Sequence, residues 1–382
     1  MRVLHTIAGF GKQWGGTTTC TYDMVSALNN AGVNADLLTP SLENGSDDTL
    51  GGNGEHWIRT VRNDCRTPFA ISTNIQRYLN DSDYDLYHTN GIWLHTHHAT
   101  CAIARKKREP YVISTHGMLY PQALERSGWK KRLMRSLLFH RDLSQASCLH
   151  VACLKEAEHI RALSYDVPIA VIGNPIRVPE YLEESCRAAA SQRRECVAVG
   201  YLGRLHERKN IDSIIRAFTK VAAPNTKLLI MGTGEKEYVD SLKRFARQKG
   251  NGNIIFTGFV EGKEKLRLLA SLRALVVASD FENFGMIVGE ALLCRTPVIC
   301  TDTAPWQALR EHRCGWWIHN DESSLGKHIA EALHLPVEEI EAMGHRGHDL
   351  VREDYDPGTI AHRMKMLYSW LIEGTAKPEF II

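Results

Sequence analysis

The sequence lacks several features that would assign a protein to a class at once. It contains no run of about 18 apolar residues, so we expect no membrane-spanning helix. The net charge of +2 gives no general reason to expect nucleic acid as a partner. The ten cysteines form no CxxC pair, and the apolar run in MRVLHTIAGF is too short for a signal-peptide core. These absences favour a cytoplasmic protein with reduced thiols.

The order of apolar runs along the chain predicts the fold class. At 382 residues the chain is too long for one ordinary core, so two domains are expected. Short β-branched runs alternate with helical patterns, which is typical of βαβ units and parallel sheets. The expected strands are 2–8, 35–39, 86–90, 111–116, 148–152, 169–173, 197–203, 227–232, 253–258, 274–279 and 297–302. The expected helices include 17–30, 155–163, 211–222, 235–249, 262–271 and 285–294.

Turn residues and two prolines in GNPIRVPE (173–180), followed by a polar stretch to about residue 194, mark the best linker candidate. We therefore predict an α/β protein with two Rossmann-like parallel-sheet domains, residues 1–174 and 175–358. A C-terminal helix within 359–382 is expected to pack back on the first domain.

A glycine-rich loop, GFGKQWGG (9–16), follows the first expected strand and includes Gly15 and Gly16. Such a loop before a helix lets a ligand approach backbone N–H groups. It misses the G-x-G-x-x-G spacing by one residue, and the second strand ends in Thr39-Pro40, where a nicotinamide enzyme has an acidic residue. A nicotinamide enzyme is thus disfavoured, while a tight turn without a ligand agrees equally well with the loop.

Two basic residues follow the first strand of the second half. Arg204 and Lys209 lie in GRLHERKN (203–210), where a strand ends and a helix begins. Basic side chains oppose the dipole at a helix start, so their placement suggests an anionic ligand such as a diphosphate. Taken alone, the pair is better explained as solvated surface charge.

The next three strands also end in glycine or polar residues. Gly232-Thr-Gly234 closes one strand, and Gly258-Phe-Val260 closes the next at a depth suited to a nucleobase. The fourth is followed by ENFGMIVGE, in which Glu282 and Glu290 stand among apolar residues and therefore need partners. Because ligands bind beyond the carboxyl ends of parallel strands, these residues predict one site.

These motifs together resemble the retaining GT-B glycosyltransferases of family four, the glycosyl transferases group 1. The resemblance extends from the first glycine loop to Trp370, and its most specific part is the pair of glutamates separated by seven residues. The strings THGMLYPQAL (115–124) and APWQAL…CGWW (304–317) are similar to bacterial transferases that build surface polysaccharides. A GT-B fold and metal-independent sugar transfer are implied, with retention of anomeric configuration.

The resemblance also implies substrates and roles. A UDP- or GDP-sugar would be the donor, a saccharide or polyprenyl-diphosphate-linked molecule the acceptor, and bacterial polysaccharide or lipopolysaccharide biosynthesis the setting. Arg204 and Lys209 would stabilise the diphosphate leaving group, while Glu282 and His116 would contact the sugar and Glu290 the ribose. The implied donor-binding residues are Gly15, Gly16, Gly203, Gly232, Gly234, Val260, Asn283, Phe284, Gly285 and Glu290. No cofactor is expected.

An acidic run and a group of histidines could each suggest a metal site, and two positions depart from the family pattern. The acidic run DSDYD (81–85) precedes a strand, at the wrong edge of a sheet for a metal site, and is expected to be a solvated turn. The histidines between His88 and His98 lack the i, i+4 spacing of a helical metal pair and are expected at the surface or crevice. Ala152-Cys153 and Gly289 depart from the family pattern; the first puts local contacts in doubt, and the second is expected to be harmless.

Two alternatives and one further partner remain open. A sugar-nucleotide epimerase or hydrolase of the same architecture, or a non-catalytic nucleotide-sugar-binding protein, would carry similar motifs.

Residues 126–141 contain six Lys and Arg and no acidic residue, and their apolar residues share one helical face. Such a helix either docks on anionic lipid at the inner face of the cytoplasmic membrane or is an ordinary packed helix.

Overall fold

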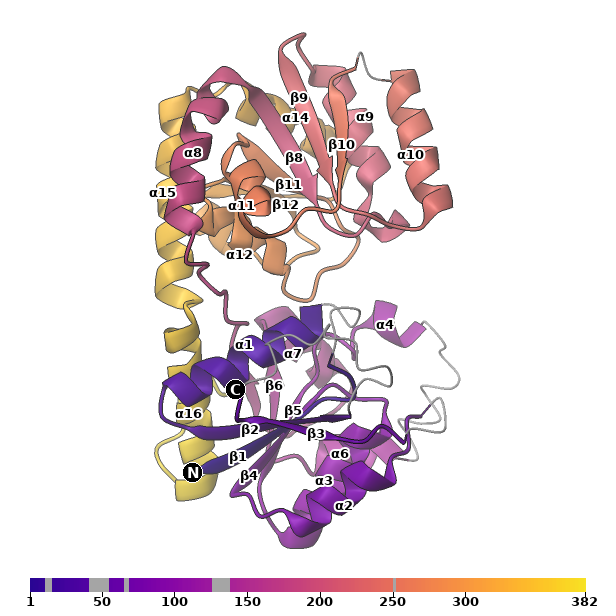
Figure 1. The fold of residues 1–382 in the computed structure, drawn as a ribbon, viewed down its shortest axis with the longest axis vertical. Coiled ribbons are helices and arrows are strands. Elements are labelled where there is room, and N and C mark those ends of the chain that lie inside the picture. The colour runs from indigo at the N-terminus through magenta and orange to yellow at the C-terminus, as the bar shows by residue number, and fades with distance from the viewer. Residues whose placement is uncertain (11–15, 41–54, 65–68, 126–137, 250–251) are drawn as a thin grey trace. The chain divides into compact units, whose positions relative to one another are not determined.

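The protein divides into two compact units (Figure 1). The computed structural model describes residues 1–10, 16–40, 55–64, 69–125, 138–249 and 252–382. Unit 1 consists of Met1–Pro175 and Pro357–Ile382, and unit 2 of Ile176–Asp356. The chain thus leaves unit 1 within the segment 173–180 and returns to it for its last helix.

Unit 1 contains a parallel sheet of seven strands in the order β3-β2-β1-β4-β5-β6-β7. Its strands are β1 (Arg2–Thr6), β2 (Asn34–Pro40), β3 (Ile58–Val61), β4 (Leu86–Asn90), β5 (Tyr111–Ser114), β6 (Cys148–Val151) and β7 (Ile169–Val171). The helices of unit 1 are α1 (Gly16–Asn30), α2 (Thr73–Asp81), α3 (His95–Lys107), α4 (Pro121–Glu125), α6 (His140–Ser144), α7 (Leu154–Ala162) and α16 (Pro357–Glu373). The strand order reverses between β1 and β4, which defines a topological switch point.

Unit 2 contains a parallel sheet of six strands in the order β10-β9-β8-β11-β12-β13. Its strands are β8 (Val197–Leu202), β9 (Thr226–Met231), β10 (Ile254–Gly258), β11 (Ala274–Val277), β12 (Val298–Thr301) and β13 (Gly315–Ile318). Its helices are α8 (Leu182–Glu195), the short η3 (Glu207–Lys209), α9 (Ile211–Val221), α10 (Lys236–Lys249), α11 (Gly262–Ala270), α12 (Met286–Leu293), α13 (Ala308–Glu311), α14 (Glu322–His334) and α15 (Val337–Asp354). Here the order reverses between β8 and β11.

The predicted fold class is confirmed, and each expected strand forms. Two strands were not predicted: β3, an edge strand with two exposed residues, and the short β13. The linker candidate extended too far, because α8 occupies most of the polar stretch up to about residue 194. Leu182, Cys186, Ala189 and Arg193 are buried at helical spacing and place one face of α8 against the domain.

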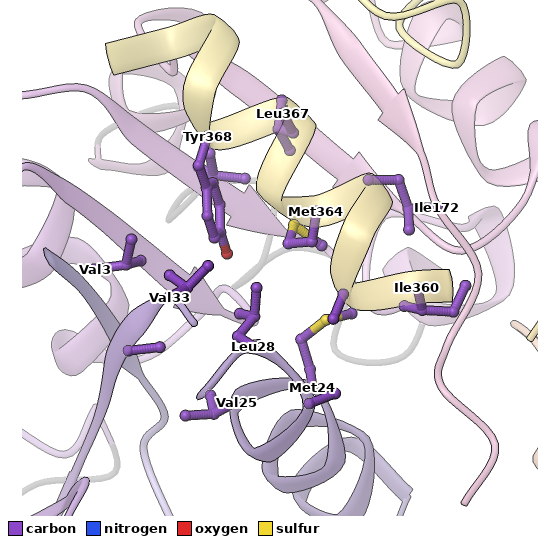
Figure 2. Packing of buried hydrophobic residues seen from close by; sticks show 14 of the residues in the cluster. Val3, Met24, Val25, Leu28, Val33, Ile172, Ile360, Met364, Leu367 and Tyr368 are labelled. Atoms are coloured by element: carbon purple, nitrogen blue, oxygen red, sulfur yellow. The ribbon is translucent and has the colours of Figure 1, made fainter. Parts of the chain in front are cut away.

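The last helix, α16, is part of the core of unit 1. Figure 2 shows Ile360, Met364 and Leu367 of α16 in the same buried cluster as Met24 and Leu28 of α1. Beyond the helix, the end of the chain pairs with the edge strand β7, because the Ile382 N–H donates to the Ile169 carbonyl at 2.9 Å. Both contacts tie the C-terminal segment to unit 1.

None of the helices within the described ranges is both long and apolar enough to cross a bilayer. Cysteines 20, 101, 148, 153, 186, 196, 294, 300 and 314 are free thiols, as expected for a protein with reduced cysteines. Gly15 and residues 126–137 of the basic segment lie outside the described residues.

Candidate functional site

The four strand ends singled out in the sequence are neighbours in the sheet of unit 2. Strands β10, β9, β8 and β11 are adjacent and parallel, so their carboxyl ends meet at one edge. The switch point between β8 and β11 lies within this set. Ligands of open α/β sheets bind at such a point, because the loops on either side of it diverge and leave a crevice.

An open pocket of about 520 Å³ lies at this edge. It is lined by Leu202, Gly203, Arg204, Gly232, Thr233, Gly234, Glu235, Phe259 and Val260. Five of the predicted site residues, Gly203, Arg204, Gly232, Gly234 and Val260, are therefore brought together. Phe259 was not predicted, although an apolar side chain that is 67% exposed beside a pocket is a feature of ligand sites.

Two of these glycines are required by close backbone packing. A Cβ atom at Gly232 would lie 1.9 Å from the Gly203 carbonyl oxygen, and one at Gly234 would lie 2.0 Å from the Leu205 oxygen. The loops after β8 and β9 also bond to one another, since the Leu205 N–H donates to the Thr233 carbonyl at 2.7 Å. The glycines therefore bring the two loops together to form one wall of the pocket.

Arg204 presents its guanidinium to this pocket with little competition. A guanidinium nitrogen of Arg204 lies 3.9 Å from Oε1 of Glu235, and both side chains are more than two thirds exposed. An exposed pair at that distance contributes little to stability. The Arg204 backbone is better fixed, because the Tyr201 hydroxyl donates to its carbonyl oxygen at 2.8 Å. The loop is thus anchored while the charge stays accessible to an anion.

Lys209 and Glu282 meet at the switch point. Lys209 ends η3 after β8, Glu282 follows β11, and the Lys209 ammonium donates to Glu282 Oε1. The Ser279 hydroxyl donates to the same oxygen at 2.7 Å. The Lys209 and Glu282 side chains are 28% and 16% exposed, so the pair is partly shielded from water. Lysine carries three donors and a carboxylate about four acceptor positions, which leaves capacity on both for a ligand.

The start of α12 rests on an aromatic cluster. The ring of Phe284 is buried and lies 5.4 Å from that of Trp306 and 5.5 Å from that of Tyr355. Gly285 has φ of +78°, a left-handed conformation that favours glycine, and Asn283 is half-buried beside it. The Phe284 side chain faces the core and its carbonyl oxygen accepts from the Trp306 Nε1–H, so its backbone N–H is the part that can serve a ligand.

Glu290 has a lysine partner. The Lys265 ammonium of α11 donates to Glu290 Oε2 at 2.9 Å, and the Glu290 side chain is 31% exposed. The carboxylate is therefore paired, as its apolar surroundings require, and it is not sealed in the core. Lys265 was not predicted, because nothing in the sequence relates it to a residue 25 positions later.

Gly289 faces a space that another side chain already fills. A Cβ atom at Gly289 would lie 2.0 Å from Cδ1 of Ile176, which is buried. Ile176 thus occupies the space that the methyl group of alanine, the usual residue of the family at position 289, would need. The residues at positions 176 and 289 therefore depend on one another.

In unit 1, His116 lies in a strained turn after β5. His116 has φ of +46° and Gly117 has φ of +73°; a non-glycine residue in this region is held there by its surroundings. The buried Glu156 provides that support, accepting hydrogen bonds from the Thr115 hydroxyl at 2.6 Å, the Gly117 N–H and the Ala152 N–H. Burial lowers the pKa of His116 to about 3, so its imidazole is neutral at physiological pH.

The expectation that the other histidines lie at the surface or crevice was wrong for His88 and His97, which are buried. Both lie on elements of the core, β4 and α3, where burial lowers their pKa. Across the described ranges, no group of three or more His, Cys, Asp and Glu side chains is arranged to hold a metal ion.

Gly16 begins α1, where a Cβ would meet no atom within 4 Å, so packing does not demand glycine there.

Two family models cover most of the chain. The model "Glycosyl transferases group 1" matches residues 189–349, and the "Glycosyl transferase 4-like domain" matches residues 15–175. The first covers the strand ends of unit 2, and the second covers the turn of His116. The protein belongs to the group 1 glycosyl transferases.

Curated relatives match shorter segments. A GDP-mannose-dependent alpha-mannosyltransferase of Mycobacterium tuberculosis is 33% identical over 119 residues, which are 31% of this chain and 29% of that protein. Matched segments span 23% to 40% of the length of the first such relatives.

Solved structures match nearly the whole chain. Anabaena HepE in complex with UDP and glucose has a TM-score of 0.72 at 18% identity, with 97% of this chain and 100% of HepE covered. WaaG, a glycosyltransferase involved in lipopolysaccharide biosynthesis, has a TM-score of 0.67 at 14% identity, with 97% and 99% covered. At these identities the likeness establishes the GT-B fold.

Proposed function

We propose that this protein transfers a sugar from a nucleotide-sugar donor to a saccharide or lipid-linked acceptor, with retention at the anomeric carbon. The observation that carries the proposal is the Lys209–Glu282 pair beside the glycine-walled pocket of Arg204. It combines a cation for a leaving diphosphate with a carboxylate for sugar hydroxyls at one switch point.

The proposed roles follow from the chemistry of each group. Arg204, with its exposed guanidinium, and Lys209, with its remaining donors, bind the diphosphate and offset the charge that develops as the glycosidic bond breaks. Glu282 accepts hydrogen bonds from the sugar, and Glu290 accepts them from the ribose diol. Two cations supply the charge that a divalent metal would otherwise provide.

The pocket also favours a nucleotide over a bare sugar phosphate. Phe259 and Val260 add an apolar surface beside the polar wall, which suits the face of a base. Support for the donor class comes from HepE, solved with UDP, and from the GDP-mannose-dependent relative.

For the acceptor we propose a polysaccharide or lipopolysaccharide precursor in a bacterial cytoplasm. The fold likeness to WaaG is one support. The basic segment 126–141 is the other, because such a segment gains about 1 kcal/mol per basic residue near an anionic lipid surface. Co-sedimentation with anionic and neutral liposomes at low and high salt tests this part. Salt-sensitive binding to anionic vesicles alone is expected, whereas equal binding to both or to neither rejects it.

A donor screen tests the function itself. Purified protein is incubated with a panel of UDP- and GDP-sugars, with and without saccharide acceptors, and released nucleoside diphosphate is measured. We expect release from one donor that increases strongly when the correct acceptor is present. Release that no acceptor increases would instead support a hydrolase, and an epimerised donor without release would support an epimerase.

A further inference from the structure

A continuous chain of buried hydrogen bonds crosses the sheet of unit 1. It connects the Ile172 carbonyl oxygen to His150, Ser114, His88, Tyr368, His5, Asn90 and finally His116. The successive distances are 2.9, 2.6, 2.6, 2.7, 2.9, 3.3 and 3.4 Å. The strand residues come from β1, β4, β5 and β6, and Tyr368 comes from α16, where its hydroxyl points into the core (Figure 2).

The first end of the chain sets the direction of its protons. The Ile172 carbonyl can only accept, so Nε2 of His150 must carry the hydrogen and donate it. A neutral His150 then has a lone pair on Nδ1, which accepts from the Ser114 hydroxyl. The Ser114 oxygen in turn accepts from Nε2 of His88, and Nδ1 of His88 accepts from the Tyr368 hydroxyl.

The opposite end gives the same direction independently. The Asn90 amide nitrogen lies 3.4 Å from the Thr6 carbonyl oxygen, which can only accept, and this orients the amide. The nitrogen therefore also donates to Nδ1 of His5, and Nε2 of His5 donates to the Tyr368 oxygen. The hydrogen-bond directions worked out from the two ends agree at Tyr368, whose hydroxyl accepts from His5 and donates to His88.

The orientation of Asn90 determines the state of His116. The amide oxygen of Asn90 faces Nε2 of His116 at 3.4 Å, so this nitrogen carries the hydrogen and Nδ1 carries the lone pair. We propose that Tyr368 is a positioning residue that acts through this chain to hold His116 as its neutral Nε2–H tautomer. Nδ1 of His116 then accepts a hydrogen bond from a substrate hydroxyl, a step that rests on the proposed function.

Burial supports a neutral chain. It lowers the pKa of His5 to about 3 and that of His150 to about 4, with repulsion between His5 and His150 adding to the effect on His5. Protonating His5 would set its Nδ1–H against the Asn90 amide nitrogen, which is also a donor. Protonating His150 would take away the acceptor of the Ser114 hydroxyl hydrogen. The chain therefore has one self-consistent arrangement, and His116 is at its end.

Removing the Tyr368 hydroxyl tests the chain. In Tyr368→Phe, the buried Nε2–H of His5 loses its acceptor, so His5 gains by moving its hydrogen to Nδ1. That hydrogen favours an Asn90 amide turned around, at the cost of the long contact, 3.4 Å, between the amide nitrogen and the Thr6 carbonyl oxygen. The amide nitrogen then faces His116, whose hydrogen moves to Nδ1. The matched control is Tyr84→Phe, which removes another buried hydroxyl of unit 1, one that donates to Asp36 at 2.7 Å outside the chain.

The first measurement uses the ¹⁵N signals of the histidine rings in the whole, substrate-free protein, with His116 assigned by its loss in His116→Gln. We expect only the Nε2–H tautomer of His116 in the wild type and in Tyr84→Phe, and a mixture in Tyr368→Phe. An Nδ1–H or doubly protonated His116 in the wild type would overturn the chain, and so would an unchanged signal in Tyr368→Phe. This result does not depend on the protein having transferase activity.

The second measurement is kcat/KM for the donor found in the screen. Tyr368→Phe is expected to lose about fivefold, the effect of one weakened hydrogen bond, while Tyr84→Phe retains the wild-type value. A mixed tautomer in Tyr368→Phe with unchanged kcat/KM would overturn the role of His116 as an acceptor for a substrate hydroxyl. If instead no donor reacts with the wild type, the proposed function fails, and the ¹⁵N result still decides whether the chain exists.

Discussion

Lys209 and Glu282 form an ion pair across the switch point of unit 2, although they lie 73 positions apart in the sequence. One follows β8 and the other follows β11, the two strands between which the order of the sheet reverses. The pair therefore depends on the topology of the whole unit. It also shows how a carboxylate stabilises a lysine that opposes a helix dipole.

Lys209→Ala, and separately Arg204→Ala, should lower kcat by about 100-fold or more, because each removes a cation that stabilises a developing charge. Steady-state release of nucleoside diphosphate measures the effect. Lys263→Ala is a matched control, since Lys263 pairs with Glu184 at 2.8 Å on the exposed surface of the same unit. Wild-type turnover in both test variants would remove the basis for the diphosphate assignment.

Gly289→Ala should lower the stability of unit 2 by about 1–3 kcal/mol, because the added methyl group overpacks the space that Ile176 fills. Thermal unfolding of the two variants Gly289→Ala and Gly289→Ala/Ile176→Val measures this, and the double variant should recover most of the loss. Gly326→Ala in α14 is the control, because its Cβ would meet only the Ala217 oxygen, at 4.0 Å. If Gly289→Ala is as stable as the control, the packing argument is wrong.

The free energy of unfolding should fall as the pH drops from about 6.5 to about 4. An unfolded histidine titrates near 6.5, whereas folding lowers the pKa of His5 to about 3 and of His150 to about 4. In that window the unfolded chain takes up protons that the folded chain does not. Each such histidine therefore contributes about 1.4 kcal/mol per pH unit, and stability is complete above 6.5.

Denaturant unfolding at a series of pH values checks this. His150→Gln should reduce the slope of the unfolding free energy against pH by the contribution of one proton, about 1.4 kcal/mol per pH unit. The fold should be kept, because glutamine can still accept from Ser114 and donate to Ile172. A slope identical to that of the wild type would mean that His150 is protonated in the folded state.

Turnover should persist in excess EDTA. The prediction rests on Arg204 and Lys209 supplying the positive charge at the leaving diphosphate, which is one of the tasks of a metal ion in other transfer enzymes. The measurement compares initial rates before and after dialysis against the chelator, with magnesium or manganese added back. Complete loss that either ion restores would show that the site needs a metal.

The sequence was sufficient for the fold and for grouping the strand-end residues at one edge of the second sheet, because both depend on local signals. Apolar runs separated by turns marked the strands, and residues just after strands must gather at one edge of a parallel sheet. Glu282 and Glu290 could be selected because a carboxylate among apolar neighbours needs a partner. The partners themselves, Lys209 and Lys265, could not be paired with them from the sequence, because strand order and helix packing bring them together.

The support of His116 could not be predicted for the same reason. Glu156 lies after β6, in the first turn of α7, where acidic residues are common. Tyr368 lies 280 positions from His88 and meets it only because α16 returns to unit 1. The polar stretch before residue 194 was misjudged because α8 buries small and cationic residues, a pattern with few large apolar side chains.

The central claim is sugar transfer with retention, and the stereochemistry of the product tests it most directly. The protein is incubated with a ¹³C-labelled donor and the acceptor identified in the screen, and the anomeric configuration of the product is determined by NMR. The account predicts a glycosylated acceptor with the anomeric configuration of the donor, together with one nucleoside diphosphate per sugar transferred. An inverted linkage, an epimerised donor or free sugar as the only product would contradict it.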